Sequence, residues 1–353
     1  MKITKTLQHA LKTGLAVGIT WIVCNWLKYY DSHRPIWALI STVLVMQSNL
    51  GSVIRASGVR IGGTLIGAVI GAIVGSLVDA NALSLALSVA LTMGVLSGIG
   101  LPETLRLAGT TAIVVLVSKQ VEEGPWLTAF FRFVEVFIGI SVAILVQTII
   151  WPSRARNELR DAALGVVLGV RQLYPIISTL SHAPVTAEES VQRDGMRAEL
   201  LSASAKLREI YGDLQREPGD HRQEILIWGA HLRFCDELEL HALALEHSQR
   251  WLRGVTLGDQ LAEPLQSLTT LTQQCLDRLV ARLEGQEVAV PATGLDAALA
   301  GCDAAMVRLR EQGITLSYAM PDVIRFCTYF FNLRAISRHA SGLEFAFALP
   351  TKK

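Results

Sequence analysis

Three charged side chains lie inside apolar stretches of the sequence. Arg60 opens the run RIGGTLIGAVIGAIVGSL, while Arg132 and Glu135 lie in RFVEVFIGISVAILVQTIIWP. A charge at the centre of a bilayer costs about 2.5–3.5 kcal/mol on insertion scales, so such residues normally face a bundle interior or a water-filled cavity. A guanidinium binds carboxylates through paired donors. We therefore predict that the two arginines contact organic anions along a conduit. No catalytic residue is predicted.

A plainer interpretation of these charges stays open. Arg132 and Glu135 are three residues apart, so on a helix they can pair with each other, and Arg132 can also extend to the membrane interface. Glu135 is in addition a candidate carrier of a coupling proton. Thr64 and Gln47 are predicted to help line the route, although hydrogen bonding between helices is the more common role of such side chains.

Glycines recur at every fourth position of the first apolar run, at Gly63, Gly67, Gly71 and Gly75. In a soluble helix each would cost about 1 kcal/mol relative to alanine. In a bilayer the same spacing lets a neighbouring backbone come close, and packing contact must supply the attraction between helices. We expect these glycines to pack helices, and Gly139 to do so in the second run.

The second run repeats the spacing of the first. Arg132, Glu135, Gly139, Ala143 and Gln147 follow one another at the same intervals as Arg60, Gly63, Gly67, Gly71 and Gly75. Each unit would hold three spans, and an odd number makes the two units inverted relative to each other. Inverted repeats are a common plan of transporters, with the substrate path where the repeats meet.

The composition divides the chain into two parts. Residues 1–152 hold 10 of the 32 lysines and arginines and 6 of the 31 acidic residues. A span needs about 20 mainly apolar residues. We therefore predict a transmembrane domain over 1–152 and a cytosolic α-helical bundle over 153–353, giving an all-α membrane protein. The six predicted spans, in a 3+3 inverted repeat, are 9–28, 35–49, 60–78, 82–99, 103–119 and 126–151.

Basic residues set the predicted orientation. Lys12, Arg55, Arg106 and Arg160 all fall on one side of a topology with an even number of spans, which makes that side cytoplasmic. Asp79 falls on the other side. Both termini are then cytoplasmic, in a multi-pass protein of the cell inner membrane.

The region after residue 153 shows helical patterning punctuated by Pro and Gly. His231 and Cys235 are four residues apart on one predicted helix, but no second ligand pair with metal spacing follows, so we expect no metal site and no cofactor.

Phosphate-binding and hydrolase motifs are absent from the sequence, and we expect a non-enzyme. The net charge of +1 comes with no basic run, so no nucleic-acid partner is predicted. The predicted helices are 154–181, 186–216, 219–252, 257–284, 292–312 and 320–347.

The run HRPIWALISTVLVMQSNLGSVIRASGVRIGGTLIGAVIG resembles the core of the fusaric acid resistance (FUSC) and aromatic acid exporter family. The similarity lies in a Pro-x-Trp-Ala entry at Pro35 and an Arg-x-x-Gly-Thr opening at Arg60. The second run is similar to the closing helix of that family. The resemblance implies efflux of organic acids driven by the proton gradient. Plant aluminium-activated malate transporters are distantly similar, so a channel is implied as well.

The leading hypothesis is transport of organic anions, aromatic carboxylates among them, out through the inner membrane. A passive anion channel of the same architecture and a non-transporting membrane scaffold are the alternatives. Many exporters of the family have two membrane blocks and this chain has one, which implies a homodimer in the lipid bilayer. An accessory protein on the outer side is a further partner that this hypothesis allows.

Overall fold

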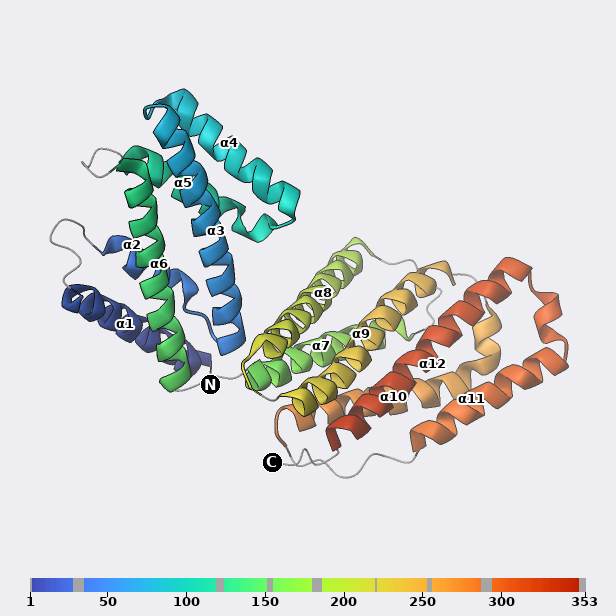
Figure 1. Ribbon diagram of the computed structural model, residues 1–353. Helices are drawn as coiled ribbons and strands as arrows, with labels where there is room; N and C mark the ends of the chain where they lie inside the picture. The colour runs from blue at the N-terminus through green and yellow to red at the C-terminus, as the bar shows by residue number, and fades with distance from the viewer. Residues whose placement is uncertain are drawn as a thin grey trace. The chain divides into compact units, whose positions relative to one another are not determined.

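The computed structural model describes residues 2–27, 35–118, 124–150, 155–179, 186–219, 221–252, 256–286 and 294–348, without the side chains of 2–6 and 155–157. These residues form twelve α-helices and no strand (Figure 1), which confirms the predicted all-α class. They fall into two compact units. The first is Met1–Ala155 with Asp213–Gly219, and the second is Arg156–Gly212 with Asp220–Lys353. The predicted boundary after residue 152 lies outside the described residues.

Six α-helices form the first unit, one in each predicted apolar segment. A short 3₁₀ helix, η1 (Pro102–Thr104), precedes the fifth of them. They are α1 (Lys2–Trp26), α2 (Ile36–Val45), α3 (Leu50–Leu77), α4 (Ala82–Ile99), α5 (Leu105–Val117) and α6 (Gly124–Ile149).

Helix α3 begins at Leu50, not near residue 60 as the sequence predicted. The cause is a cap: the Asn49 side-chain oxygen accepts a hydrogen bond from the Ser52 backbone N–H at 2.8 Å. Such a cap satisfies one of the free N–H groups of the first turn and starts the helix early. Arg60 consequently lies about 15 Å along the helix axis from its first residue. Arg60 therefore lies well inside α3 and not in its first turn.

Three of the described helices, α3, α4 and α6, are long and apolar enough to cross a membrane. Helix α2 is a shorter apolar helix of 10 residues, and α5 has 13 residues. Helix α4 also carries large apolar side chains on its outer surface, with Leu83, Leu87 and Leu91 all exposed. A row of this kind is stable where lipid covers it.

The helix pairs of the first unit follow a regular pattern. Helix α3 packs against α5, as α6 packs against α2; α4 packs against α5, as α1 packs against α2. Helix α3 also contacts α4, as α6 contacts α1, and α3 and α6 pack against each other at the centre of this unit (Figure 1). Exchanging α1 with α4, α2 with α5 and α3 with α6 therefore reproduces the same set of contacts.

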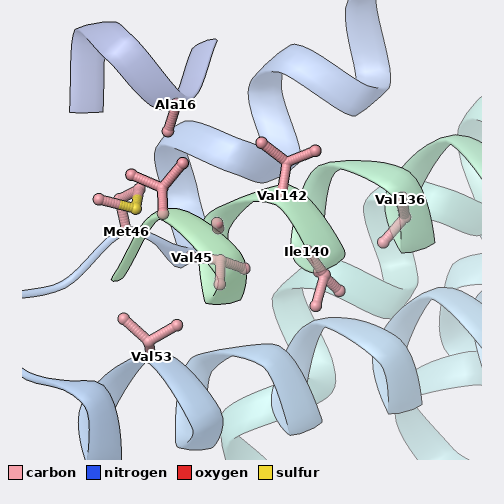
Figure 2. Close-up of a cluster of buried hydrophobic side chains, with 9 residues drawn as sticks. Ala16, Val45, Met46, Val53, Val136, Ile140 and Val142 are labelled. Carbon is pink, nitrogen blue, oxygen red and sulfur yellow. The ribbon is translucent and has the colours of Figure 1, made fainter. Parts of the chain in front are cut away.

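One end of this unit is held by a cluster of buried apolar side chains around α6. Val136, Ile140 and Val142 of α6 lie close to Val45 at the end of α2 and to Val53 of α3 (Figure 2). Ala16 of α1 and Met46 complete the part of the cluster that is labelled in the figure. The small and β-branched side chains leave little space between the four helices, so this packing supplies many dispersion contacts.

The central helices α3 and α6 each come very close to a neighbouring helix of the apolar block at one glycine. A Cβ atom at Gly67 of α3 would lie 2.2 Å from the carbonyl oxygen of Ala108 in α5. A Cβ atom at Gly139 of α6 would lie 2.3 Å from the carbonyl oxygen of Ala38 in α2. Gly71 is similar, at 2.9 Å from the Ala112 oxygen, whereas Cβ atoms at Gly63 and Gly75 would find their nearest neighbours at 3.3 Å. Since a backbone cannot yield as a flexible side chain can, only glycine fits at Gly67 and Gly139.

The second unit contains the remaining six α-helices, each within a few residues of its predicted range. Helix α12 packs along α9 and also contacts α10 and α11. Tyr174 and Tyr329 are among its fully buried side chains, and Tyr329 donates a hydrogen bond to the Ser178 carbonyl at 2.6 Å. The helices are α7 (Ala155–Ile177), α8 (Ala187–Arg216, whose end from Asp213 belongs to the first unit), α9 (Arg222–Trp251), α10 (Ala262–Leu283), α11 (Gly294–Glu311) and α12 (Met320–Ala348).

We predict that Gly67→Ala destabilises the protein, because the new methyl group must push the α5 backbone away. Overpacking of this kind typically costs about 1–3 kcal/mol. Thermal unfolding of the detergent-solubilised protein, followed by tryptophan fluorescence, measures the effect. The matched control is Gly62→Ala on the same helix, where an added Cβ has no neighbour within 4 Å. Equal melting temperatures for the two variants would contradict the close approach at Gly67.

Candidate functional site

A pocket of about 310 Å³ lies in the first unit between the end of α2, the first half of α3 and the start of α5. Its wall is part apolar and part charged. The lining residues are Leu44, Val45, Gln47, Ser52, Arg55, Ala56, Val59, Arg60, Glu103 and Leu107. Two of the predicted substrate-path residues, Arg60 and Gln47, thus share one pocket.

Arg60 is the buried cation of this pocket, with only 6% of its surface exposed. Its Nε and Nη2 atoms donate to the Ser41 hydroxyl of α2 at 3.4 and 3.3 Å. Both distances are long for hydrogen bonds. Within the described part of the chain, no carboxylate forms an ion pair with Arg60. A guanidinium has five N–H donors, so most of the capacity of this one is left for another acceptor.

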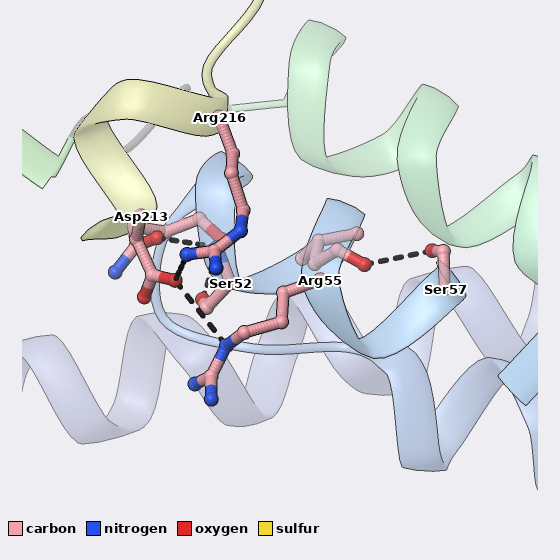
Figure 3. A network of polar contacts seen from close by, with 7 residues as sticks. Ser52, Arg55, Ser57, Asp213 and Arg216 are labelled. Atoms are coloured by element: carbon pink, nitrogen blue, oxygen red, sulfur yellow. Dashed lines mark hydrogen bonds and ion pairs between the residues drawn. The ribbon is translucent and has the colours of Figure 1, made fainter. Parts of the chain in front are cut away.

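The second arginine of the pocket, Arg55, already has an acidic partner. Its Nε lies 3.3 Å from the carboxylate of Asp213, in the segment that belongs to the first unit. Arg216 lies 3.8 Å from the same oxygen, and Figure 3 shows both arginines directed at this carboxylate. Asp213 is buried, with 3% of its side chain exposed. Arg55 is therefore neutralised locally, which sets Arg60 apart. No local signal in the sequence marks Asp213 as a partner, because it lies far from Arg55 along the chain.

Thr64 and Gln47 occupy different surroundings. Gln47 is exposed on the pocket and donates to the Leu44 carbonyl at 3.4 Å. Thr64 lies one turn beyond Arg60 on α3 and is buried, with 1% exposure. Its hydroxyl oxygen has no hydrogen-bond partner among the residues described. A buried hydroxyl without a partner is uncommon, and it keeps Thr64 a candidate contact for a polar ligand.

Arg132 and Glu135 are not among the residues that line this pocket. They pair with each other on α6, with 3.0 Å between Arg132 Nη1 and Glu135 Oε2. The Arg132 guanidinium also lies over the ring of Trp37, 4.8 Å from its centroid. Glu135 is 5% exposed. The ion pair that the sequence left open is therefore present, and the cation–π contact adds to it.

A further buried charge escaped the sequence analysis. Lys12 of α1 is 5% exposed, and its Nζ lies 3.5 Å from the side-chain oxygen of Gln147 on α6. Gln147 in turn donates to the Ser48 carbonyl at 3.4 Å. Gln147 occupies the position of the second run that corresponds to Gly75 in the first. This correspondence was the one signal in the sequence that indicated Gln147. Lys12 was considered only as a marker of orientation.

In the second unit the structure gives no support to the His231 and Cys235 pair as a reactive or ligating site. His231 is buried between aromatic rings, stacked on Phe347 at 4.1 Å and edge-on to Trp228 at 5.1 Å. Burial lowers the pKa of His231, so its neutral form is favoured. Burial raises the pKa of the Cys235 thiol to about 12, and the nearby Asp236 adds to the shift. The thiolate that a nucleophile or metal ligand requires is therefore scarce at neutral pH.

Apolar helices of membrane-spanning length, with buried charges between them, define this chain as a multi-pass helical membrane protein. Residues 19–146 match the family described as fusaric acid resistance protein-like. The match covers α2–α5, the end of α1 and most of α6, and the matched family is associated with efflux and transport. A search of curated proteins found no match to the chain.

The Arg132–Glu135 pair leads to a prediction about stability. Replacing Glu135 with Gln leaves a largely buried guanidinium without its carboxylate, whereas Arg132→Gln combined with Glu135→Gln removes both charges. Breaking one side of a buried pair is more costly than replacing both. A double-mutant cycle on the thermal stability of the solubilised protein should give a coupling of about 1–3 kcal/mol. Strictly additive effects would show that the two charges do not stabilise each other.

Proposed function

We propose that this protein is a homodimeric inner-membrane exporter of organic anions, aromatic carboxylates among them, driven by the proton gradient. Both termini face the cytoplasm in this proposal. The observation that carries it is Arg60, a buried guanidinium that lines a pocket and has no carboxylate paired with it in the described residues. Burying a charge within an apolar bundle is costly, and function is the usual reason why such a charge is retained.

The chemistry of the pocket suits an organic anion. The Arg60 guanidinium provides paired donors for a carboxylate, and the Gln47 amide offers a neutral donor on the same wall. Leu44, Val45, Val59 and Leu107 give part of the wall an apolar surface for the carbon skeleton. The same wall also includes Arg55 and the acidic Glu103. Pockets for small organic ligands commonly combine an apolar lining with a few polar groups that fix orientation.

The arrangement of the helices supports a 3+3 inverted repeat of six membrane spans. The exchange of α1–α3 with α4–α6 reproduces the helix pairs. It also relates two close backbone contacts at equivalent places, Gly67 on Ala108 and Gly139 on Ala38. In transporters built on inverted repeats, alternating access is largely the movement of one repeat against the other around a site between them. In this proposal the packed glycine faces of α3 and α6 form the rigid wall of the path.

Arg132 and Glu135 are the proposed gate at the other end of the path. As a pair they are neutral, and the guanidinium is held by the carboxylate at 3.0 Å. Protonation of Glu135 would release Arg132, which could then bind an anion. Each transport cycle would then move one proton on Glu135. This role requires both residues, so a coupled transporter loses proton dependence when Glu135 is replaced.

Assembly and orientation in this proposal rest on the family resemblance and on charge. A homodimer would supply the second membrane block that many exporters of the family carry in one chain. The cytoplasmic side is assigned from basic residues such as Arg55, Arg106 and Arg160. The proposed bundle of the second unit then lies in the cytoplasm, and an outer-side accessory protein would complete a route across a second membrane.

We predict that Arg60→Gln lowers the flux of organic anions at least tenfold, because the pocket loses its buried cation. The measurement is uptake of a panel of labelled aromatic and aliphatic carboxylates into proteoliposomes with an imposed pH gradient. Arg60→Lys keeps the charge but not the paired donors, so we expect intermediate flux. Arg106→Gln is the matched control, since Arg106 is exposed and does not line the pocket. Undiminished flux in Arg60→Gln would overturn the assignment of Arg60.

The same assay separates the alternatives. Anion flux that follows the anion gradient and moves no protons would identify a passive channel. Proton-coupled flux in the wild type that becomes independent of pH in Glu135→Gln would support the gate. Absence of flux for the whole panel would favour a membrane scaffold over a transporter.

A further inference from the structure

Three metal-ligating side chains meet in the second unit, outside the pocket described above. Glu237 and His241 lie on α9, and His339 lies on α12. One ligand atom from each residue lies within 4.8 Å of the others. The sequence predicted no metal site, because no second ligand pair with metal spacing follows His231 and Cys235 along the chain. His339 is brought to the other two only by the packing of α12 along α9.

The local fold explains why the three side chains converge. Glu237 and His241 are four residues apart, so they lie on one face of α9. Helices α9 and α12 come close to each other at Gly342 of α12, where an added Cβ would lie 2.7 Å from the Phe234 ring of α9. The rings of His241 and His339 then stack, with centroids 5.5 Å apart and planes 14° from parallel.

The hydrogen bonds of Asn332 fix the tautomer of His241. Asn332 is buried, with 5% exposure, and its amide nitrogen donates to the Thr328 carbonyl at 2.8 Å. This orientation turns its amide oxygen toward His241 Nδ1, at 2.9 Å. An amide oxygen only accepts, so Nδ1 carries the proton and donates it. In the neutral ring Nε2 therefore presents a lone pair.

That lone pair faces an acceptor. His241 Nε2 lies 3.5 Å from a carboxylate oxygen of Glu237. Two acceptors face each other favourably only when a positive charge lies between them, either a second proton on the ring or a metal ion. A donor to Nδ1 from outside the ligand set is the arrangement commonly found behind metal-binding histidines, where it holds the ring and raises its basicity.

We propose that Glu237, His241 and His339 bind a divalent first-row transition metal ion, zinc being the ion that the ligand set suits. Two imidazoles and one carboxylate are borderline ligands typical of zinc, whereas calcium and magnesium prefer oxygen alone. The Glu237 side chain is 40% exposed and that of His241 12%, so an ion reaches the site from solvent. A water molecule would fill the fourth coordination position of the ion. The ion would link α9 to α12, so the ordered packing of these helices would depend on bound metal.

The test is zinc binding by the full-length protein, purified in detergent without a polyhistidine tag and stripped with a chelator. We expect one high-affinity zinc ion per chain by mass spectrometry and titration calorimetry. His339→Gln and His241→Gln should each weaken binding at least thirtyfold. His247→Gln is the matched control, because His247 is an exposed histidine on α9 that does not belong to the ligand set.

X-ray absorption at the zinc edge gives a readout that a change in folding alone does not imitate. We expect a scattering contribution from two imidazoles with nitrogen at about 2.0–2.1 Å, and from one imidazole in His339→Gln. Equal zinc content and affinity in the wild type and His339→Gln, or a zinc spectrum without imidazole, would overturn the proposal.

Discussion

Close contact between helix backbones is the constraint on which the first unit depends. Helices α3 and α6 each bear a glycine, Gly67 and Gly139, that lies directly against a carbonyl oxygen of a neighbouring helix. In a bilayer the hydrophobic effect does not draw helices together, so attraction must come from contact over short distances. These two contacts place α5 and α2 on the two central helices. Ser41 of α2, to which Arg60 donates, and Ala38, which Gly139 contacts, lie one turn apart. The environment of the buried cation is therefore set by the same packing.

The buried and partly buried charges of the first unit are satisfied to different degrees. Arg132 is held by Glu135, and Arg55 by Asp213, while Lys12 lies beside the Gln147 amide. Each of these arrangements offsets part of the cost of removing a charge from water. In the described part of the chain, the hydrogen-bond partner of Arg60 is the Ser41 hydroxyl, at a long distance. Arg132 and Arg55 thus have acidic partners, whereas Arg60 lies beside the pocket with most of its N–H donors available.

The sequence predicted the number and places of the helices well because apolar runs and Gly or Pro punctuation are local signals. It misplaced the start of α3, since the capping power of Asn49 was hidden in a polar run that looked like the end of the preceding span. Glycine spacing predicted close packing without naming the partner; Ala108 and Ala38 emerge only from the tertiary structure. For the site, Arg60 and Gln47 could be found as polar residues near apolar runs. Asp213 and His339 could not, because nothing local marks a contact between segments far apart in the chain.

The short length of α2 has a consequence for how strongly the pocket can hold a ligand. This helix ends at Val45, and its last turn contributes Leu44 and Val45 to the wall beside Arg60. The carboxyl end of a helix carries a partial negative charge of about half an electron, which attracts a guanidinium and repels an anion. Under the proposed function, a carboxylate at Arg60 would compete with the helix end for the same cation. Such competition would favour brief occupancy and ready release, as turnover requires and a storage site would avoid.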